Sequence, residues 1–228
     1  MLRQRGTLTV AADLTYPPFA YDRPNDIPAG FEADLLRAIG KQLKMDVLIV
    51  NRATSALVPG LLGHRHDLAA AGLIDTDELT EETCTSTPYM SADLALLVSS
   101  PDPHDITGPD DLDGRPVGVL RNSRAEDWVR EHMGGSDIRT LAADADLIDA
   151  LADRTVDAIV EEHAVALYAL TKEKDLRVAS VIPMGTKHVM AAAPDNGALM
   201  SRIDGALGRL ESNGKLAKIR AKWFGPGA

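Results

Sequence analysis

Two arginines lie close to the expected start of a helix. Arg121 and Arg124 flank Ser123, which follows a strand expected over 116–120. Ser123 opens the helix, with Glu126 three residues later at capping-box spacing. Helix N-termini attract anions because the first main-chain N–H groups have no partner within the helix. We therefore expect at least one arginine to contact an anionic ligand group; the alternative is that both are solvated beside a surface loop.

A pair of acids, Glu161 and Glu162, follows the strand expected over 156–160. A carboxylate at the carboxyl end of a strand suits a cationic ligand group where that end faces a cleft. The alternative is an exposed acidic pair that opens a helix, which the helix dipole alone would explain.

Other chemistries lack their residues. His64 and His66 flank Arg65 in an expected surface loop, and no third and fourth zinc ligand follows at fitting spacing. No Gly-x-Ser-x-Gly elbow and neither phosphate-loop fingerprint occurs. Cys84 has no positive neighbour to lower its pKa, so it is not expected to act as a nucleophile. We expect no metal, no cofactor and no catalytic residue.

Composition narrows the class of protein further. The chain has 228 residues, with 34 acids against 24 bases and a net charge of −10, which argues against binding nucleic acid. The single cysteine excludes an intrachain disulfide. No apolar run approaches the ~18 residues that span a bilayer. Residues 1–5 lead straight into a strand with no signal-peptide pattern, so the protein is either intracellular or a mature form whose leader has been removed.

Short apolar runs alternate with amphipathic helical patterns, which is typical of an α/β protein. The turn-rich segment 99–103 interrupts this alternation, which restarts near residue 116. Strands are expected over 8–12, 47–50, 68–71, 94–99, 116–120, 156–160, 176–179 and 188–193. Helices are expected over 31–43, 55–62, 76–82, from 123, and over 144–153, 199–210 and 215–224.

Eight motifs in order give the chain a resemblance to a known family. They are Leu8–Asp13, Tyr16, Pro18-Phe19, Gly30–Leu35, Asp67–Gly72, Leu112–Arg115, Val156–Ala158 and Asn213-Gly214 with Lys222–Gly225. The chain resembles the polar-amino-acid class (family 3) of extracytoplasmic solute-binding proteins, which serve ATP-binding-cassette importers. The resemblance implies a two-lobed type II periplasmic-binding-protein fold, with two α/β lobes, two hinge strands and a ligand cleft between the lobes. Lobe one would be residues 1–94 and 192–228 and lobe two residues 95–191, with the 94–99 and 188–193 strands crossing between them.

The resemblance assigns ligand contacts in lobe one to five residues. These are Asp13 after the first strand, the ring of Tyr16, main-chain groups of Ala71 and Gly72, and the hydroxyl of Thr76. Tyr16 could instead pack against the neighbouring prolines, and Thr76 could instead cap the following helix. The family's stacking aromatic near the second strand is missing, because its position holds Thr54.

One departure from the family concerns the ligand carboxylate. Relatives usually place an arginine three residues after the threonine, and here that position is Leu79. An aliphatic side chain cannot form the charge-assisted pair. We expect Arg124 or Arg121 of lobe two to substitute, with the main chain at Ser123, while Glu162 would meet the ligand ammonium.

The resemblance predicts a binding protein that captures an amino acid or an amino-acid derivative by lobe closure. Its partners would be that ligand and the membrane permease of an importer, and we expect a monomer located outside the cytoplasm. Two alternatives stay open. A few relatives of this fold became dehydratases of cyclic hydroxy acids, for which Glu162 would be the acid, and others are sensory domains of receptors.

Overall fold

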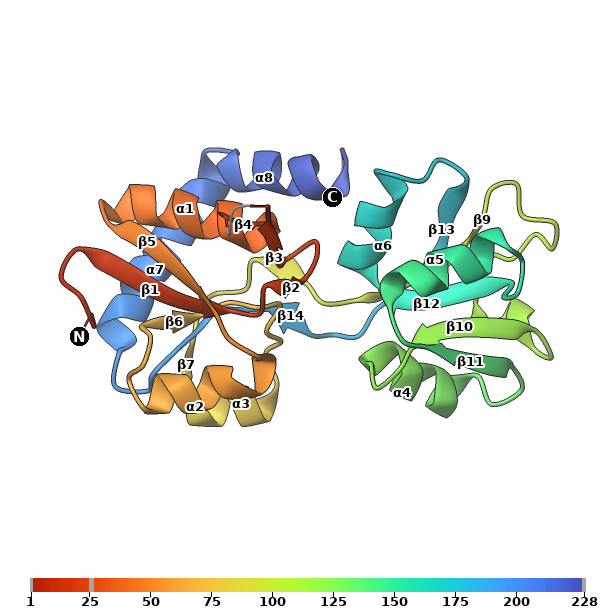
Figure 1. Ribbon diagram of the computed structural model, residues 1–228, viewed down its shortest axis with the longest axis horizontal. Coiled ribbons are helices and arrows are strands. Elements are labelled where there is room, and N and C mark those ends of the chain that lie inside the picture. Colours follow the sequence, from red (N-terminus) through yellow and green to blue (C-terminus); the bar gives the residue numbers. More distant parts are fainter. Residues whose placement is uncertain (1, 25–26, 227–228) are drawn as a thin grey trace. The chain divides into compact units, whose positions relative to one another are not determined.

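Two five-stranded sheets of mixed direction dominate the computed structural model, which describes residues 2–24 and 27–226 (Figure 1). Each sheet belongs to its own unit. Unit 1 comprises Met1–Ser91 and Thr186–Ala228, and unit 2 comprises Ala92–Gly185. Among the described residues, none of the helices has the length and apolar character needed to cross a membrane. The two units are described in turn.

The sheet of unit 1 is built around a buried first strand. Its order is β5 (Asp46–Asn51), β1 (Thr7–Ala12), β6 (Leu68–Ala69), β15 (Ala191–Ala192) and β7 (Cys84–Thr85). Strand β1 runs parallel to β5 and β6, whereas β15 runs antiparallel to β6 and β7. Smaller sheets join β2 (Thr15–Tyr16), β3 (Ala20–Arg23) and β4 (Ile27–Ala29), and pair β8 (Met90–Ser91) with β14 (Lys187–His188).

Helices cover both faces of this sheet. Figure 1 shows α1 (Phe31–Leu43) and α8 (Lys215–Phe224) on one side, with α2 (Leu57–Leu62) and α3 (Asp77–Glu82) on the other. Helix α7 (Gly197–Ser212) packs against α1 and α8, and a 3₁₀ turn, η1 (Thr54–Ala56), precedes α2.

Helix α1 shows why this sequence folds as it does. Leu35, Leu36 and Ile39 recur on one face and are fully or almost fully buried, as the amphipathic pattern predicts. The helix begins after Gly30, whose φ of 122° suits glycine. A side chain at that position would collide with the main chain of Phe19.

Unit 2 repeats the same plan with a second sheet. Its order is β11 (Asp137–Leu141), β10 (Pro116–Leu120), β12 (Ala158–Glu162), β9 (Leu94–Ser99) and β13 (Leu176–Ile182). Strands β10, β11 and β12 are parallel, and β9 runs antiparallel to β12 and β13. The helices are η2 (Pro109–Leu112), α4 (Arg124–His132), α5 (Asp144–Ala152) and α6 (His163–Leu170).

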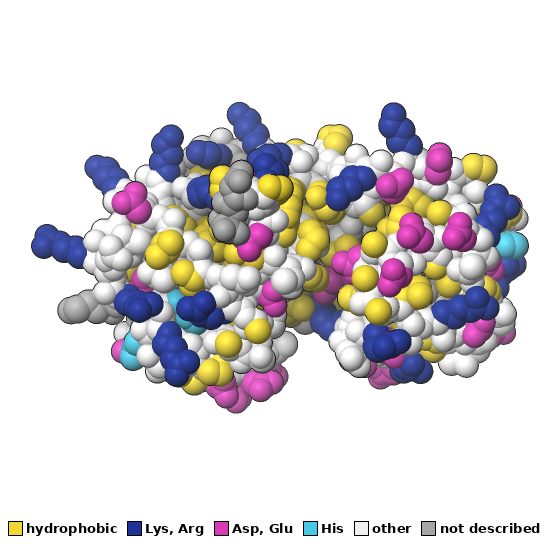
Figure 2. Space-filling model, viewed as in Figure 1, with side chains coloured by type: hydrophobic (Ala, Val, Ile, Leu, Met, Phe, Trp, Pro, Cys, Tyr) yellow, Lys and Arg dark blue, Asp and Glu magenta, His cyan; other side chains and the backbone are white. Residues whose placement is uncertain are grey.

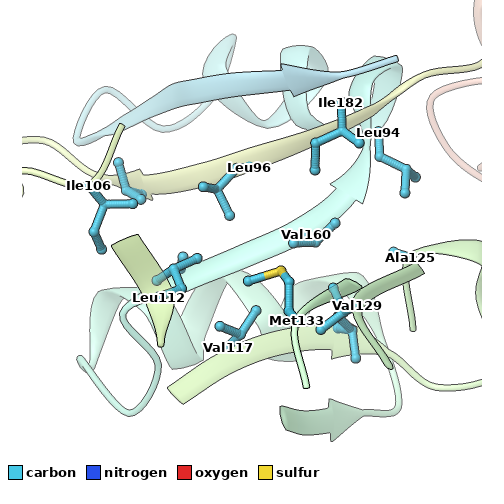
Figure 3. Packing of buried hydrophobic residues seen from close by; sticks show 13 residues of the cluster. Leu94, Leu96, Ile106, Leu112, Val117, Ala125, Val129, Met133, Val160 and Ile182 are labelled. Atoms are coloured by element: carbon cyan, nitrogen blue, oxygen red, sulfur yellow. The ribbon is translucent and has the colours of Figure 1, made fainter. Parts of the chain in front are cut away.

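Strand β9 supplies side chains to both faces of its sheet. Leu94 and Leu96 pack into a cluster with Val129 of α4 and Val160 of β12 (Figure 3). Ala95 and Leu97 point to the opposite face and join a cluster under α5 and α6. Alternate residues of a strand point to opposite faces, so a fully apolar strand indicates a sheet that is covered on both sides.

The chain passes between the units twice, after Ser91 and after Gly185. Strand β9 pairs only with unit 2 strands, whereas β14 and β15 pair with unit 1 strands. The first passage precedes β9 because the main-chain carbonyl and side chain of Asp93 accept hydrogen bonds from the N–H groups of His163 and Met184. The lobe boundaries that we expected after 94 and before 192 are three and six residues beyond the ends of the units at Ser91 and Gly185.

Candidate functional site

Unit 2 brings two of the predicted ligand residues into direct contact. Arg124 is the first residue of α4, and Glu162 is the last residue of β12. The Nη1 atom of Arg124 lies 3.0 Å from Oε1 of Glu162 and 3.2 Å from the main-chain oxygen of Ala92. The side chains are 30% and 11% exposed, respectively, so the pair lies at a partly buried edge of the unit.

Burial makes the charge of Glu162 costly. It raises the pKa of the Glu162 carboxyl above its usual range, and the carboxylate of Asp93 adds to the rise. The guanidinium of Arg124 opposes the rise by charge attraction and by its hydrogen bond. The ionised form of Glu162 is therefore stabilised by the opposite charge of Arg124.

Ser123 begins helix α4 as expected. Its Oγ accepts a hydrogen bond from the N–H of Glu126 at 3.1 Å and donates to the main-chain oxygen of Leu120 at 2.6 Å. The carboxylate of Glu126 accepts from the N–H of Asn122 rather than from that of Ser123. The side chain of Arg121 is exposed, and its main-chain N–H binds the carbonyl of Leu141. Of the two arginines, Arg124 is the one held beside Glu162.

Unit 1 brings Tyr16 and Gly72 together. A Cβ atom at Gly72 would lie 3.0 Å from the ring of Tyr16, and the φ of Gly72 is +64°, so both space and conformation favour glycine. The Tyr16 ring stacks on Phe19, with ring centroids 5.2 Å apart, and Phe19 in turn contacts the ring of His188 at 4.8 Å. Tyr16 is therefore part of an aromatic cluster with Phe19 and His188.

The peptide groups of Gly72 are held from two sides. Its N–H donates to Oε1 of Glu32 at 2.9 Å, and its carbonyl oxygen lies 3.2 Å from Nδ1 of His188. The hydroxyl of Tyr89 donates to the same oxygen of Glu32. Glu32 is fully buried, which raises its pKa to about 7, although the hydrogen bonds from Tyr89 and Gly72 work in the other direction.

Sequence reasoning missed this surrounding layer. It gave no role in the site to Glu32, Phe19, Tyr89 or His188. The available signal was the position of Glu32 between two apolar residues, Phe31 and Ala33, two residues after Gly30.

The carboxylate of Asp13 is occupied by local contacts. Its Oδ1 accepts from the N–H and hydroxyl of Thr15, and its Oδ2 accepts from the N–H and hydroxyl of Thr54. Partial burial tends to raise the pKa of Asp13, but these four hydrogen bonds outweigh it and lower that pKa. Asp13 therefore ties the end of β1 to the start of η1, and its contact with a ligand stays a prediction.

Thr76 caps helix α3. Its Oγ1 accepts a hydrogen bond from the N–H of Leu79 at 3.3 Å, so the capping alternative is confirmed and the ligand role stays a prediction. The side chain of Thr76 is exposed. Figure 2 shows acidic side chains gathered over α3, whose sequence carries four acids.

Leu79 belongs to the core of unit 1. Its side chain is 8% exposed and lies in a cluster with Ala71, Leu57, Leu61 and Val189. Ala71 is thus a core residue next to Gly72. The position at which the family carries its arginine serves packing in this chain.

Neither histidine of the 64–66 loop is arranged for a metal. His66 is buried with its Nε2 3.0 Å from the carbonyl of Leu57, and His64 lies near Asp195. Within residues 2–24 and 27–226, no three His, Cys, Asp or Glu side chains are grouped so that they could hold a metal ion.

Comparisons with known proteins agree with this architecture. The chain is 28% identical to the L-cystine-binding protein TcyJ of Escherichia coli K12 over 98% of this chain and 85% of the relative. It is 27% identical to ABC transporter arginine-binding protein 1 of the same strain, over 92% of this chain and 87% of the relative.

Solved structures give the same result. The ancestral cationic amino acid solute binding protein AncCDT-1 superimposes with a TM-score of 0.90 at 26% identity, covering 96% of both chains. In another structure AncCDT-1 is described as a precursor of cyclohexadienyl dehydratase. An ancestral arginine-binding protein bound to arginine has a TM-score of 0.74 at 29% identity, covering 97% of this chain and 99% of that one.

These structures place the two-unit architecture in the type II periplasmic-binding-protein fold. The family model of the bacterial extracellular solute-binding proteins, family 3, matches residues 8–226, which is nearly the whole chain. Since that match spans both units, the chain belongs to the bacterial extracellular solute-binding proteins, family 3.

Proposed function

We propose that this protein binds a free amino acid or a close derivative and delivers it to an ATP-binding-cassette importer. The observation that carries the proposal is the pair formed by Arg124 and Glu162, which are 3.0 Å apart and partly buried. An amino acid carries a carboxylate and an ammonium on one carbon atom. Such a zwitterion can take Arg124 for its carboxylate and Glu162 for its ammonium, so neither protein charge loses its partner.

In this proposal Arg124 also replaces the arginine that the family carries at the position of Leu79. A planar guanidinium binds a carboxylate with two parallel hydrogen bonds, and the N-terminus of α4 adds main-chain donors. In this proposal Glu162 turns from Arg124 to the ligand ammonium. In unit 1, Gly72 and the ring of Tyr16 stay proposed ligand contacts.

The first test is a thermal-shift screen followed by calorimetry. The panel holds the twenty amino acids, cystine, ornithine, betaines, opines and small carboxylates. A ligand that binds only the folded state raises the melting temperature as its concentration exceeds the dissociation constant. We expect at least one zwitterion to do so, and a panel without any response would contradict the proposal.

Variants then test the pair formed by Arg124 and Glu162. Arg124→Ala and Glu162→Gln should each weaken the zwitterion at least about tenfold, or ~1.4 kcal/mol. Arg130→Ala is the matched control, because it removes an exposed arginine of the same helix that pairs with Glu126. Equal affinities for Arg124→Ala and Arg130→Ala would refute the role of Arg124.

The remaining parts of the proposal concern location, partner and oligomeric state. The family is extracellular, so we propose a location outside the cytoplasm and a membrane permease as the partner. We further propose a monomer without catalytic activity or nucleic-acid binding. The ligand side chain is left to the screen, since the relatives bind cystine and arginine.

A dehydratase is the second candidate, because Glu162 is a buried carboxyl with a raised pKa and AncCDT-1 is a dehydratase precursor. An acid catalyst needs such a pKa. The ion pair with Arg124 favours the ionised form of Glu162 and argues for binding instead. Loss of water from cyclic hydroxy acids, followed by absorbance and abolished in Glu162→Gln, would establish the enzyme.

A further inference from the structure

Glu32 is a buried acid that contacts Gly72, and the proposed function gives it no role. We infer that Glu32 is a positioning residue of the binding site: together with His188 it holds the Gly72 peptide groups, and through them the surface that Gly72 and Tyr16 present. The inference rests on the proposed function, because it takes Gly72 and Tyr16 as ligand contacts. The contacts from which it is argued all lie within unit 1. Glu32 is not expected to touch the ligand.

The geometry leaves Gly72 little freedom. Its N–H is bound by Oε1 of Glu32 at 2.9 Å, and its carbonyl oxygen lies 3.2 Å from the ring nitrogen of His188. The segment adopts a left-handed conformation, with φ at +64°. Glycine reaches this conformation without strain, but it loses more conformational freedom than any other residue when it is held there. Glu32 contacts Gly72 from α1, and His188 contacts Gly72 from β14.

Burial favours a proton on the carboxyl of Glu32, whereas the hydrogen bonds from Tyr89 and Gly72 favour the ionised form. The elements packed around it bring Tyr89, whose hydroxyl donates to Oε1, and His188, whose ring stacks on that of Tyr89 at 6.3 Å. From α8, Arg220 donates to the main-chain oxygen of Tyr89 at 2.5 Å and not to Glu32. Among the described residues, Oε2 of Glu32 is buried without a hydrogen-bond partner.

A carboxyl in this place changes its strength as an acceptor with pH. Burial raises the pKa of Glu32 to about 7. An ionised oxygen accepts a stronger hydrogen bond than a protonated one. The bond to the N–H of Gly72 should therefore strengthen as pH rises through neutrality, which a glutamine of the same shape could not reproduce.

The main experiment follows the amide of Gly72 by NMR without any ligand. In the wild type its proton and nitrogen shifts should titrate with a midpoint near pH 7. Glu32→Gln should abolish this titration. Tyr89→Phe removes a hydrogen bond that lowers the pKa of Glu32, so it should move the midpoint upward. Glu161→Gln is the matched control, because it changes another buried glutamate, in unit 2, whose pKa is raised to about 8.

Each result has a clear reading. A Gly72 titration that persists in Glu32→Gln would assign it to His188 and overturn the inference. No titration in the wild type, or an unchanged midpoint in Tyr89→Phe, would also overturn it. Because no ligand is present, these outcomes are independent of whether an amino acid binds.

Affinity gives the second readout, with the zwitterion found by the screen. Glu32→Ala should weaken binding at least about fivefold, while Glu32→Gln should recover most of that loss because its amide oxygen can still accept from Gly72. Glu81→Gln, an exposed acid on α3, is the control and should leave affinity unchanged. If Glu32→Ala fails to fold, the Gly72 amide in Glu32→Gln and Tyr89→Phe still decides the matter. Wild-type affinity in a folded Glu32→Ala would overturn the positioning role.

Discussion

Two buried glutamates, Glu32 and Glu161, accept hydrogen bonds from the N–H groups of Gly72 and Glu162, which are predicted ligand residues. In both, burial raises the pKa, for Glu161 to about 8 with a further contribution from Asp144. Each thus places an ionisable group directly behind a candidate contact. Because burial raises the pKa of Glu32 to about 7 and that of Glu161 to about 8, both carboxyls should ionise as pH rises through this range, which changes the hydrogen bonds that they accept.

Stability should therefore depend on pH through Glu32. Its pKa rises from 4.5 to about 7 on folding, so the folded state holds the proton more tightly. The resulting stabilisation is present below pH 4.5 and is lost as pH rises through 7, a change of about 3 kcal/mol. Urea denaturation between pH 4.5 and 8 measures it as the difference between wild type and Glu32→Gln. Parallel stability curves for the two proteins would show that Glu32 is not the group responsible.

A second residue-scale prediction concerns Leu79. Restoring the family's arginine by Leu79→Arg would put a charge into a cluster where the side chain is 8% exposed. We expect a loss of about 2–4 kcal/mol in the free energy of unfolding and no gain in amino-acid affinity. Leu62→Arg, at a residue that is 48% exposed, is the matched control and should cost little. A stable Leu79→Arg protein that binds amino acids more tightly would contradict the core role of Leu79.

Candidate residues of the site could be named from the sequence, but the contacts between them could not. The resemblance pointed to Arg124 and Glu162 separately, as ligands for opposite charges. Their contact depends on α4 and β12 lying side by side, which no local pattern contains. Similarly, Leu79 departed visibly from the family, yet only packing reveals that it belongs to a core.

Among elements, helices with a clear amphipathic period and strands with a continuous apolar run were predicted well. The helices at 31–43 and 215–224 and the strands at 94–99 and 116–120 have the expected bounds. Helix α6 was missed because its sequence HAVALYAL is apolar on all sides and offers no amphipathic stripe. Strands β2, β3 and β4 are two to four residues long, too short to show alternation.

The start of α4 allows a prediction for an element. Ser123→Ala removes the acceptor for the N–H of Glu126 and should destabilise unit 2 by about 1 kcal/mol. Ser201→Ala provides the control: that serine lies inside α7 and binds only the carbonyl of Gly197, four residues earlier. It should be neutral or slightly stabilising. Chemical denaturation of both variants checks the difference, and equal effects would mean that the cap contributes nothing.

At the scale of the whole molecule, unit 2 should fold alone. Strands β9 to β13, helices α4 to α6 and both apolar clusters of its sheet all lie within residues 92–185. A fragment of this stretch should unfold cooperatively on heating and give a dispersed NMR spectrum. Residues 1–91 alone lack β15, α7 and α8, so they should not. A disordered 92–185 fragment would show that unit 2 needs the rest of the chain.

The position of β15 in its sheet has a consequence for protein synthesis. This strand lies between β6 and β7, but it follows the whole of unit 2 in the sequence. On the ribosome, β7 has no neighbour and β6 has one open edge until residues 191–192 emerge. Unpaired edges invite wrong association, and partly made domains expose apolar surface. The strands of unit 1 that precede unit 2 in the sequence therefore complete their sheet only after unit 2 has been translated. We expect chaperones to bind this part of the chain during translation.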